Sequence, residues 1–358
     1  MNGARPAVPL VNIGILGTAS IAWRKMLPAL REIPGVRVTA IAGRCAERTA
    51  EFVARFGGEP VTGYAALLDR ADVDAVYLPL PNALHHRWAV AALRAGKHVL
   101  VEKPLTTSAE HTAELLELAD RHALVLRENF TFLHHPMHAA VRRLLDEGRF
   151  GRPRTVTGSF CFPPLPATDV RYRPDLGGGA LLDAGVYPLR WAQWLLGDDL
   201  EVAGAVLRVD ADTGLDLSGS ALLTSPSGVT VCAEFGFEHS YASRYRLWGS
   251  DAQLLVDRAF SPPSTYQPVL RIDEQDHAEE IVLPAANQFA RSAAAFVAAI
   301  RRAGAGEHAN DPAEGAATMR TARLVDDILG CARTVPVPAA VPTGAPVEAA
   351  SPVPVGSA

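Results

Sequence analysis

Lys103 lies in the sequence Val-Glu-Lys-Pro, directly after a short apolar segment, residues 98–101, that we expect to form a buried strand. Ligands of open α/β sheets bind beyond the carboxyl ends of the strands, where this lysine would lie. An ammonium group at that place would donate a proton to a reacting carbonyl oxygen or polarise it. The same residues also fit a surface ion pair between Glu102 and Lys103 before a turn proline.

Asp183 and Tyr187 follow a run of three glycines, residues 177–179, and are four positions apart. In a helix this spacing is about one turn, so both side chains can face the same cleft. A carboxylate and a phenol there would orient a substrate hydroxyl and supply a proton. From the residues alone, a helix N-cap for Asp183 and a core position for Tyr187 are the better explanations.

The first expected strand leads into a turn of small residues, Gly-Ile-Leu-Gly-Thr-Ala-Ser-Ile-Ala, at positions 14–22. In a dinucleotide-binding turn, Gly17 allows the tight bend, Ala19 lets the backbone approach a pyrophosphate, and Ala22 lets helix and strand pack closely. Alanine at the second position departs from the three-glycine pattern, and an ordinary turn of small residues would look similar. The predicted cofactor contacts in this turn are Gly17, Thr18, Ala19, Ser20 and Ile21.

The end of the second expected strand indicates which dinucleotide binds. Enzymes that use NAD usually carry an Asp or Glu there for the ribose 2′-hydroxyl. Here the strand ends at Arg44, and the first carboxylate is Glu47. The Arg44 guanidinium suits a 2′-phosphate by charge and can stack on adenine, and Arg48 follows about one helical turn later. We therefore predict NADP(H) as the cofactor; a solvated surface arginine is the alternative.

Apolar segments and helical patterns alternate through the first third of the chain. The expected strands are residues 11–16, 36–42, 73–78, 98–101 and 123–126, and the expected helices are residues 22–33, 47–56, 85–95 and 108–122. Ser108 is expected to cap the last of these helices. This alternation predicts βαβ units and a doubly wound parallel sheet, a Rossmann domain over residues 11–126.

The pattern changes after an expected helix at residues 137–147. Strands are then expected at residues 154–162, 202–209, 218–225, 229–237, 244–249 and 252–257, and helices at residues 187–196, 288–302 and 313–333. Alternating apolar and polar residues in these strands predict an antiparallel sheet with one covered face. The fold class is therefore α/β, with the Rossmann domain followed by an α+β domain at residues 127–334 that contains a large, mostly antiparallel sheet.

The composition, 48% hydrophobic and 20% charged, is typical of a soluble globular protein. The formal net charge of −5 provides no basic surface for nucleic acid or an anionic membrane. No segment is long and apolar enough to span a bilayer. Four widely separated cysteines have no metal-ligand spacing, so we predict no metal site and a reducing, cytoplasmic location. Residues 1–10 and 335–358 are predicted to be disordered tails.

Six short motifs follow one another in a characteristic order. They are the turn at residues 14–22, Tyr64-x-x-Leu67-Leu68, Pro81-Asn82-x-x-His85, Glu102-Lys103-Pro104, Glu128-Asn129-Phe130, and the segment from Gly177 through Asp183 to Tyr187. Each motif is modest alone, whereas the ordered set is specific and extends over about residues 11–330. On these motifs the chain resembles the glucose–fructose oxidoreductase, inositol dehydrogenase and MocA (Gfo/Idh/MocA) family.

The resemblance implies a Rossmann domain followed by an α+β domain, in agreement with the expected elements. It implies that Lys103 faces the reacting carbon and that Asp183 and Tyr187 reach the cleft from the second domain. The cofactor contacts implied outside the turn and the second strand are Leu80, Pro81, Asn82, His85, Glu102, Lys103 and Asn129. The implied substrate contacts are Lys103, Phe130, Arg171, Arg173, Asp183 and Tyr187. A homo-oligomer, a dimer or tetramer, is also implied.

Tyr187 stands where many members of the family carry histidine, and the chain looks most similar to the ketoreductases of antibiotic pathways that reduce C3 of dTDP-3-keto-deoxysugars. This implies hydride transfer from NADPH to a sugar ketone, with Lys103 stabilising the alkoxide. The proton would come from Lys103 or from Tyr187, whose pKa a nearby ammonium would lower. Asp183 would orient a hydroxyl or Lys103. Arg171 and Arg173 would contact a diphosphate, unless they are ordinary surface residues.

Two other functions stay open at this point. One is an NADP-dependent free-sugar or trans-dihydrodiol dehydrogenase that uses the same residues in the oxidative direction. The other is a regulator that senses NADP without turnover. The presence of both Lys103 and Tyr187 argues against a regulator, because a sensor needs neither residue.

Overall fold

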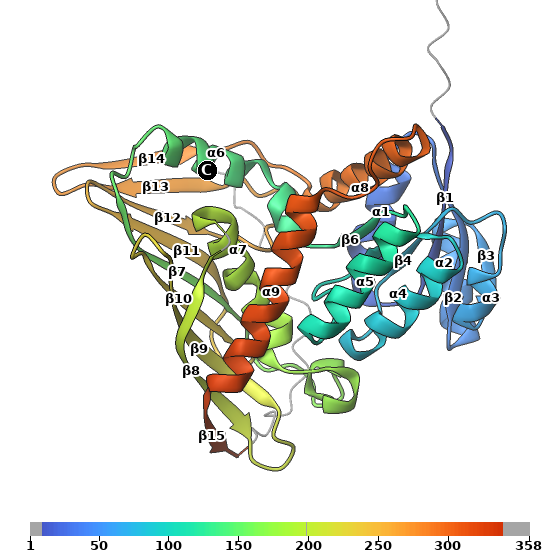
Figure 1. The fold of residues 1–358 in the computed structure, drawn as a ribbon, viewed down its shortest axis with the longest axis horizontal. Helices are drawn as coiled ribbons and strands as arrows, with labels where there is room; N and C mark the ends of the chain where they lie inside the picture. Colours follow the sequence, from blue (N-terminus) through green and yellow to red (C-terminus); the bar gives the residue numbers. More distant parts are fainter. Residues whose placement is uncertain (1–8, 198, 339–358) are drawn as a thin grey trace, which may run out of the picture.

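The first part of the chain forms a parallel sheet of six strands in the order β3-β2-β1-β4-β5-β6 (Figure 1). The computed structural model describes residues 9–197 and 199–338. The strands are β1 (Val11–Leu16), β2 (Val36–Gly43), β3 (Glu59–Thr62), β4 (Ala75–Leu78), β5 (His98–Val101) and β6 (Leu126–Glu128). The direction of chain progression reverses between β1 and β4, and open α/β sheets bind ligands beyond the strand ends at such a point. The predicted Rossmann arrangement is confirmed.

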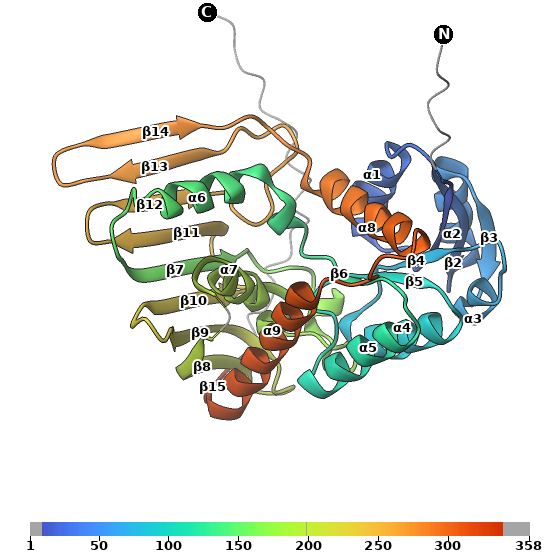
Figure 2. The same ribbon diagram turned by 45° about the horizontal axis from the view of Figure 1, so that its top comes forward.

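Helices cover both faces of this sheet (Figure 2). They are α1 (Leu27–Arg31), α2 (Ala46–Phe56), α3 (Tyr64–Leu68), α4 (His85–Arg94) and α5 (Ala109–Arg121). The central strands are apolar because both of their faces are covered, and every residue of β4 is buried. Ser108 caps α5 as predicted, since its hydroxyl accepts a hydrogen bond of 3.3 Å from the backbone N–H of His111.

The second sheet has nine strands in the order β14-β13-β12-β11-β7-β10-β9-β8-β15. They are β7 (Pro153–Cys161), β8 (Glu201–Asp210), β9 (Asp216–Thr224), β10 (Thr230–Gly236), β11 (Ala242–Gly249), β12 (Gln253–Asp257), β13 (Val269–Asp273), β14 (Ala278–Val282) and β15 (Arg333–Val337). Most neighbours are antiparallel, while β7 with β10 and β8 with β15 are parallel. The predicted large, mostly antiparallel sheet is confirmed.

Four further helices pack against the two sheets. They are α6 (Pro136–Asp146), α7 (Val186–Leu196), α8 (Gln288–Gly304) and α9 (Pro312–Cys331). Helices α6, α7 and α9 lie over one face of the large sheet, with Trp191 and Leu324 in its core (Figure 1). Helix α8 returns to the first sheet, where Phe296 packs with Met26 and Leu27 near α1 (Figure 2). Residues 127–334, predicted as one domain, therefore include a helix whose apolar face belongs to the Rossmann core.

Several elements differ from the expectations. The strand expected at residues 123–126 lies at Leu126–Glu128, because Ala123 has a φ of +52° and the chain is still turning there. The sequence patterns missed β3, α3, β13 and β14. Residues 335–337, expected to begin a disordered tail, form the end of β15, and the other tail predictions fall mostly outside the described residues. Among the described residues, no helix has the length and apolar character needed to cross a membrane.

Candidate active site

Lys103 lies two residues after the end of β5, at the carboxyl edge of the parallel sheet. Asp183 of the second domain holds its ammonium group. Nζ donates hydrogen bonds to Oδ1 and to the backbone carbonyl oxygen of Asp183, each at 2.8 Å. It also lies 5.1 Å from the centre of the Tyr187 ring. The side chains of Lys103 and Asp183 are 11% and 15% exposed, so water has little access to the pair. The three predicted catalytic residues therefore lie together.

Asp183 belongs to a turn of π-helix, Leu181–Gly185, that leads directly into α7. Asp216, the first residue of β9, fixes the start of this turn, since its Oδ2 accepts a hydrogen bond of 2.6 Å from the backbone N–H of Leu181. The residue that precedes the turn as its N-cap is Ala180. Asp183 is thus inside the helical segment and is not its cap, and its carboxylate is available to side chains.

A second cation, Arg171, shares the Asp183 carboxylate. Its Nε donates a hydrogen bond of 2.6 Å to Oδ2 of Asp183, and its Nη1 donates one of 3.1 Å to Oδ1 of Asp169. Burial alone would raise the pKa of Asp183, but the charges of Lys103 and Arg171 outweigh it and hold that pKa well below its ordinary value. Asp183 is therefore ionised at neutral pH.

Aromatic rings surround Tyr187 and form the floor of the site. The ring centre of Phe160 lies 4.7 Å from that of Tyr187, and those of Phe130 and Phe132 lie 5.8 Å away. Phe130, a predicted substrate contact, is 3% exposed and packs edge-on against Tyr187. These rings hold the tyrosine in place and keep its surroundings apolar.

Glu102, the residue before the lysine, is anchored by hydrogen bonds on the inner side of the sheet. The hydroxyl of Tyr77 and Nδ2 of Asn129 both donate to its Oε1, each at 2.6 Å. Asn129 in turn accepts a hydrogen bond of 2.7 Å from the Ser292 hydroxyl of α8. Burial raises the pKa of Glu102, and the hydrogen bonds from Tyr77 and Asn129 offset part of that rise. Glu102 and Asn129 thus fix the backbone that carries Lys103.

The turn after β1 has the shape and residue sizes that a dinucleotide pyrophosphate requires. Gly17 has a φ of +120°, and a Cβ added to it would lie 2.8 Å from Cδ2 of Leu80. Its N–H donates a hydrogen bond of 2.8 Å to the carbonyl of Ala42, which holds the turn against β2. Thr18 and Ala19 are half-buried, and Ser20 is exposed where the helical segment begins. A backbone of small residues at a helix N-terminus suits a phosphate.

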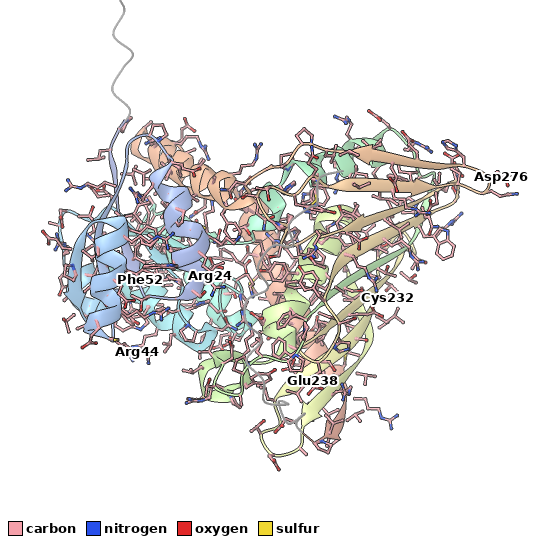
Figure 3. All side chains as sticks on the ribbon, turned by 180° about the vertical axis from the view of Figure 1, so that it is seen from behind. Arg24, Arg44, Phe52, Cys232, Glu238 and Asp276 are labelled. Carbon is pink, nitrogen blue, oxygen red and sulfur yellow. The ribbon has the colours of Figure 1, made fainter. Side chains whose placement is uncertain are left out.

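Arg44 and Arg48 follow β2 on the same side as this turn, and both are exposed. Figure 3 shows Arg44 at the lower edge of the Rossmann domain. Arg48 Nε donates a hydrogen bond of 2.7 Å to the carbonyl of Thr18, so this arginine braces the turn. Arg44 lies near the hydroxyl of Tyr64: burial raises the pKa of this tyrosine, and the nearby Arg44 charge offsets part of the rise. These cations fit the 2′-phosphate of NADP(H) by charge and position.

The segment after β4 places Pro81, Asn82 and His85 beside the Rossmann edge. His85 is fully buried, and its Nδ1 and Nε2 lie 2.7 Å and 2.8 Å from the carbonyls of Pro104 and Leu80. Burial lowers its pKa. His85 therefore ties two loops together rather than facing a ligand, whereas Asn82 donates a hydrogen bond to the carbonyl of Gly177 in the second domain.

Two family models match the chain. The first, "Oxidoreductase family, NAD-binding Rossmann fold", covers residues 11–130, and the second, "GFO/IDH/MocA C-terminal domain", covers residues 138–255. A dTDP-3,4-didehydro-2,6-dideoxy-alpha-D-glucose 3-reductase of Actinomadura kijaniata is 51% identical over 328 residues, which are 92% of this chain and 97% of that protein. The chain belongs to the Gfo/Idh/MocA oxidoreductase family.

Other members of the Gfo/Idh/MocA family are similarly close. A protein of the same description from Streptomyces violaceoruber is 50% identical over 339 residues, 94% of this chain and 99% of that protein. The crystal structure of KijD10, a 3-ketoreductase from Actinomadura kijaniata in complex with NADP and TDP-benzene, is 51% identical and has a TM-score of 0.89. The match covers 92% of this chain and 100% of the KijD10 chain. The family resemblance of the sequence is confirmed.

One expectation for this Gfo/Idh/MocA protein is wrong. A nearby ammonium was expected to lower the pKa of Tyr187. In the structure that pKa is raised well above its ordinary value, first by burial and then by the negative charges of Asp183 and Glu102. The apolar rings and the two carboxylates outweigh any effect of Lys103, so the tyrosine is a neutral hydroxyl at neutral pH.

The structure separates the two arginines that were predicted to contact substrate. Arg171 reaches the Lys103–Asp183 pair, as described above. Arg173 forms hydrogen bonds of 2.9 Å and 2.7 Å with Asp175 and has a side chain that is 55% exposed, so it lies outside that cluster. The sequence analysis noted the Tyr64 motif, but nothing in that motif indicated that Tyr64 lies near Arg44.

Proposed function

We propose that this chain reduces a keto group of a nucleotide-linked deoxysugar with NADPH, at C3 of a dTDP sugar. The observation that carries the proposal is the Lys103 ammonium, which Asp183 holds above the Tyr187 ring at the carboxyl edge of the Rossmann sheet. Relatives of about half-identical sequence, matched over nearly their whole length, are 3-reductases of such sugars, which supports the substrate class.

NADPH supplies the hydride when it is bound. Gly17, Thr18, Ala19, Ser20 and Ile21 would hold its pyrophosphate, Arg44 and Arg48 its 2′-phosphate, and Leu80, Pro81, Asn82, His85, Glu102, Lys103 and Asn129 would form or support the wall beside the nicotinamide. The small residues of the turn and the exposed guanidinium groups after β2 support these assignments.

The chain's own residues then bind and protonate the carbonyl oxygen of the substrate. An ammonium has three N–H donors, and Asp183 accepts from two of those of Lys103. The third is available to the carbonyl oxygen, where it stabilises the negative charge that develops as the carbon gains a hydride. A proton from Lys103 or from the neutral Tyr187 hydroxyl completes the alcohol. Phe130 and its neighbouring rings exclude water from this place.

The direct test is to follow the absorbance of NADPH with enzymatically prepared dTDP-3,4-didehydro-2,6-dideoxy-α-D-glucose as substrate. Loss of NADPH that depends on the sugar, much slower with NADH, is the expected result. The matched control is Lys103→Ala, which should bind NADPH and turn over little. Reduction of NADP⁺ by a free sugar or a trans-dihydrodiol, with no activity on the nucleotide sugar, would contradict the proposal. Tight NADPH binding without any turnover would indicate a sensor.

We also infer a homo-oligomer with a cytoplasmic location. The outer face of the large sheet, on which Cys232 is labelled in Figure 3, exposes Val206, Leu222 and Trp248 by 45%, 43% and 50%. Several large apolar side chains exposed on one face of a sheet are typical of subunit contacts. Light scattering of the purified chain would give its mass; a monomer at working concentration contradicts the inference. Trp248→Glu should shift an oligomer towards smaller species.

A further inference from the structure

Arg171 connects the active-site pair to a fourth charged residue. Lys103, Asp183, Arg171 and Asp169 form a row of alternating charges in which each neighbouring pair is in hydrogen-bond contact. The two oxygens of Asp183 are divided between two cations, with Oδ1 on Lys103 and Oδ2 on Arg171 at 2.8 Å and 2.6 Å. The two cations therefore fix the orientation of the Asp183 carboxylate group.

The orientation of this carboxylate determines how many N–H groups of Lys103 remain available for another partner. With Oδ2 occupied by Arg171, Asp183 takes two N–H groups of Lys103, one through Oδ1 and one through its backbone carbonyl. Without Arg171, the carboxylate is free to turn and offer both oxygens to the ammonium. All three donors of Lys103 would then be engaged with Asp183, and none would remain for a substrate oxygen.

We propose that Arg171 is a positioning residue for the reduction: it holds Asp183 so that Lys103 keeps one N–H for the substrate's carbonyl oxygen. The inference rests on the proposed function and adds to it a residue that acts through Asp183. Arg171 then acts on the rate of reduction, kcat. The sequence had instead indicated that Arg171 contacts the substrate diphosphate.

The backbone around Arg171 is built to hold this side chain in place. Oδ1 of Asp169 accepts a hydrogen bond of 3.0 Å from the N–H of Arg171 and caps the short helix Val170–Tyr172. The carbonyl of Arg171 accepts one of 3.0 Å from Gly179, whose φ is +112°. A side chain on Gly178 would clash with that same carbonyl. The glycine run therefore serves to bring Arg171 close to Asp183.

Arg173 provides a matched control, because it lies on the same loop and pairs with Asp175 instead of Asp183. We expect Arg171→Ala to lower kcat by at least about tenfold, the scale of a misplaced catalytic group, with KM for the nucleotide sugar changed less than about threefold. Arg173→Ala should stay close to the wild type in kcat, because its partner is Asp175 and not Asp183, while any contact of Arg173 with the substrate diphosphate would change KM alone. A raised KM with unchanged kcat in Arg171→Ala, or no change at all, would overturn the proposal.

One further variant and a chemical rescue separate positioning from a general loss of structure. Arg171→Lys keeps the charge but replaces the planar fork by a point charge, so we expect it to recover only part of kcat. Added guanidinium chloride should partly restore kcat of Arg171→Ala and leave Arg173→Ala unchanged, with sodium chloride at equal ionic strength as the control. Equal effects of the two salts on Arg171→Ala would contradict the proposal.

A spectroscopic measurement tests the same idea without any turnover. The chain contains only three lysines, Lys25, Lys97 and Lys103, so protein grown with isotope-labelled lysine gives few side-chain NMR signals. In the unliganded full chain, Arg171→Ala should shift the Lys103 side-chain signal and leave those of Lys25 and Lys97 in place. An unmoved Lys103 signal overturns the inference. Suppose that the wild-type protein fails to reduce the nucleotide sugar, while Arg171→Ala still shifts the Lys103 signal. The assigned substrate is then wrong, and the contact by which Arg171 positions Asp183 is still supported.

Discussion

Nδ2 of Asn82 lies 2.8 Å from the carbonyl oxygen of Gly177, which follows it by 95 positions in the chain. Asn82 belongs to the segment after β4 on the Rossmann side, and Gly177 begins the glycine run that leads to Asp183. A Cβ on Gly177 would lie 2.8 Å from the backbone nitrogen of Ala83, so this approach requires glycine. The Asn82–Gly177 hydrogen bond and the Lys103–Asp183 pair are thus two separate contacts between the Rossmann domain and the second domain.

Removal of the Lys103 side chain should affect chemistry more than cofactor binding. We expect Lys103→Ala to lower kcat by about a hundredfold or more, because the substrate oxygen loses its cationic donor. The fold should persist, since Arg171 still neutralises Asp183. Steady-state rates and NADPH fluorescence titrations would measure the two effects, with the exposed Lys25→Ala as the control. An unchanged rate would remove Lys103 from the chemistry.

Cofactor selectivity should depend on Arg44. Loss of its guanidinium should weaken NADPH about ten- to a hundredfold, the worth of one hydrogen bond to a charged group, and leave NADH nearly unaffected. Tyr64→Phe should give a smaller loss of the same kind, because the tyrosine hydroxyl lies near Arg44. Arg37→Ala, an exposed change at the opposite end of β2, is the matched control. Equal weakening of NADPH and NADH by Arg44→Ala would rule out the 2′-phosphate contact.

Tyr187 should not set the alkaline limit of the reaction. Burial, together with the charges of Asp183 and Glu102, raises its pKa, so the hydroxyl stays protonated beyond its ordinary limit of about pH 10. Tyr187→Phe removes a neutral donor, and we expect kcat to fall only about three- to tenfold. Rate profiles of both proteins between about pH 6 and pH 10 should lose activity at the same alkaline pH. A displaced alkaline limb in the variant would show that Tyr187 ionises in this range.

Asp216 should make the stability of the protein depend on pH. Burial raises its pKa to about 6 in the folded chain, above the ordinary value of about 4. The folded state therefore holds this proton more tightly than the unfolded state. Its stabilising contribution is complete below about pH 4 and is lost as the pH rises through about 6.

The comparison with Asp216→Asn isolates that contribution, because asparagine does not ionise. The melting temperature of the wild type should fall relative to that of Asp216→Asn as the pH is raised from about 4.5 to about 7.5. Asp212→Asn, an exposed change in the preceding turn, controls for the loss of a surface charge. A difference between wild type and Asp216→Asn that is constant over this range would contradict the assignment.

The parts of the fold that follow from local pattern were predictable from sequence. Strands such as β4, buried throughout, are apolar along their whole length, and the helices between them carry one apolar face. The pairing of Lys103 with Asp183 is different, because 80 positions and a domain boundary separate them. Only the family resemblance brought the two residues together before the structure did.

The missed features have physical reasons. The hairpin of β13 and β14 lies at the edge of the sheet, and β14 alternates exposed with half-buried residues, so it carries little apolar signal. The pKa of Tyr187 depends on how Phe130 and Phe160 enclose it, which no spacing in the sequence reveals. The partner of Arg171 was likewise hidden, because Asp169, Asp175 and Asp183 are all close to it along the chain.

Strand β15 covers part of one edge of the large sheet, and this has a consequence for how the protein behaves in solution. Residues Arg333–Val337 pair in parallel with β8 from Val206 to Asp210. Pro336 within the covering strand has no N–H to offer a further strand, which makes it a poor template for aggregation. A chain cut after residue 332 would uncover the β8 backbone next to the exposed Val206. Such a chain should aggregate at concentrations where the full chain stays monodisperse, because β15 would no longer cover this edge of the sheet.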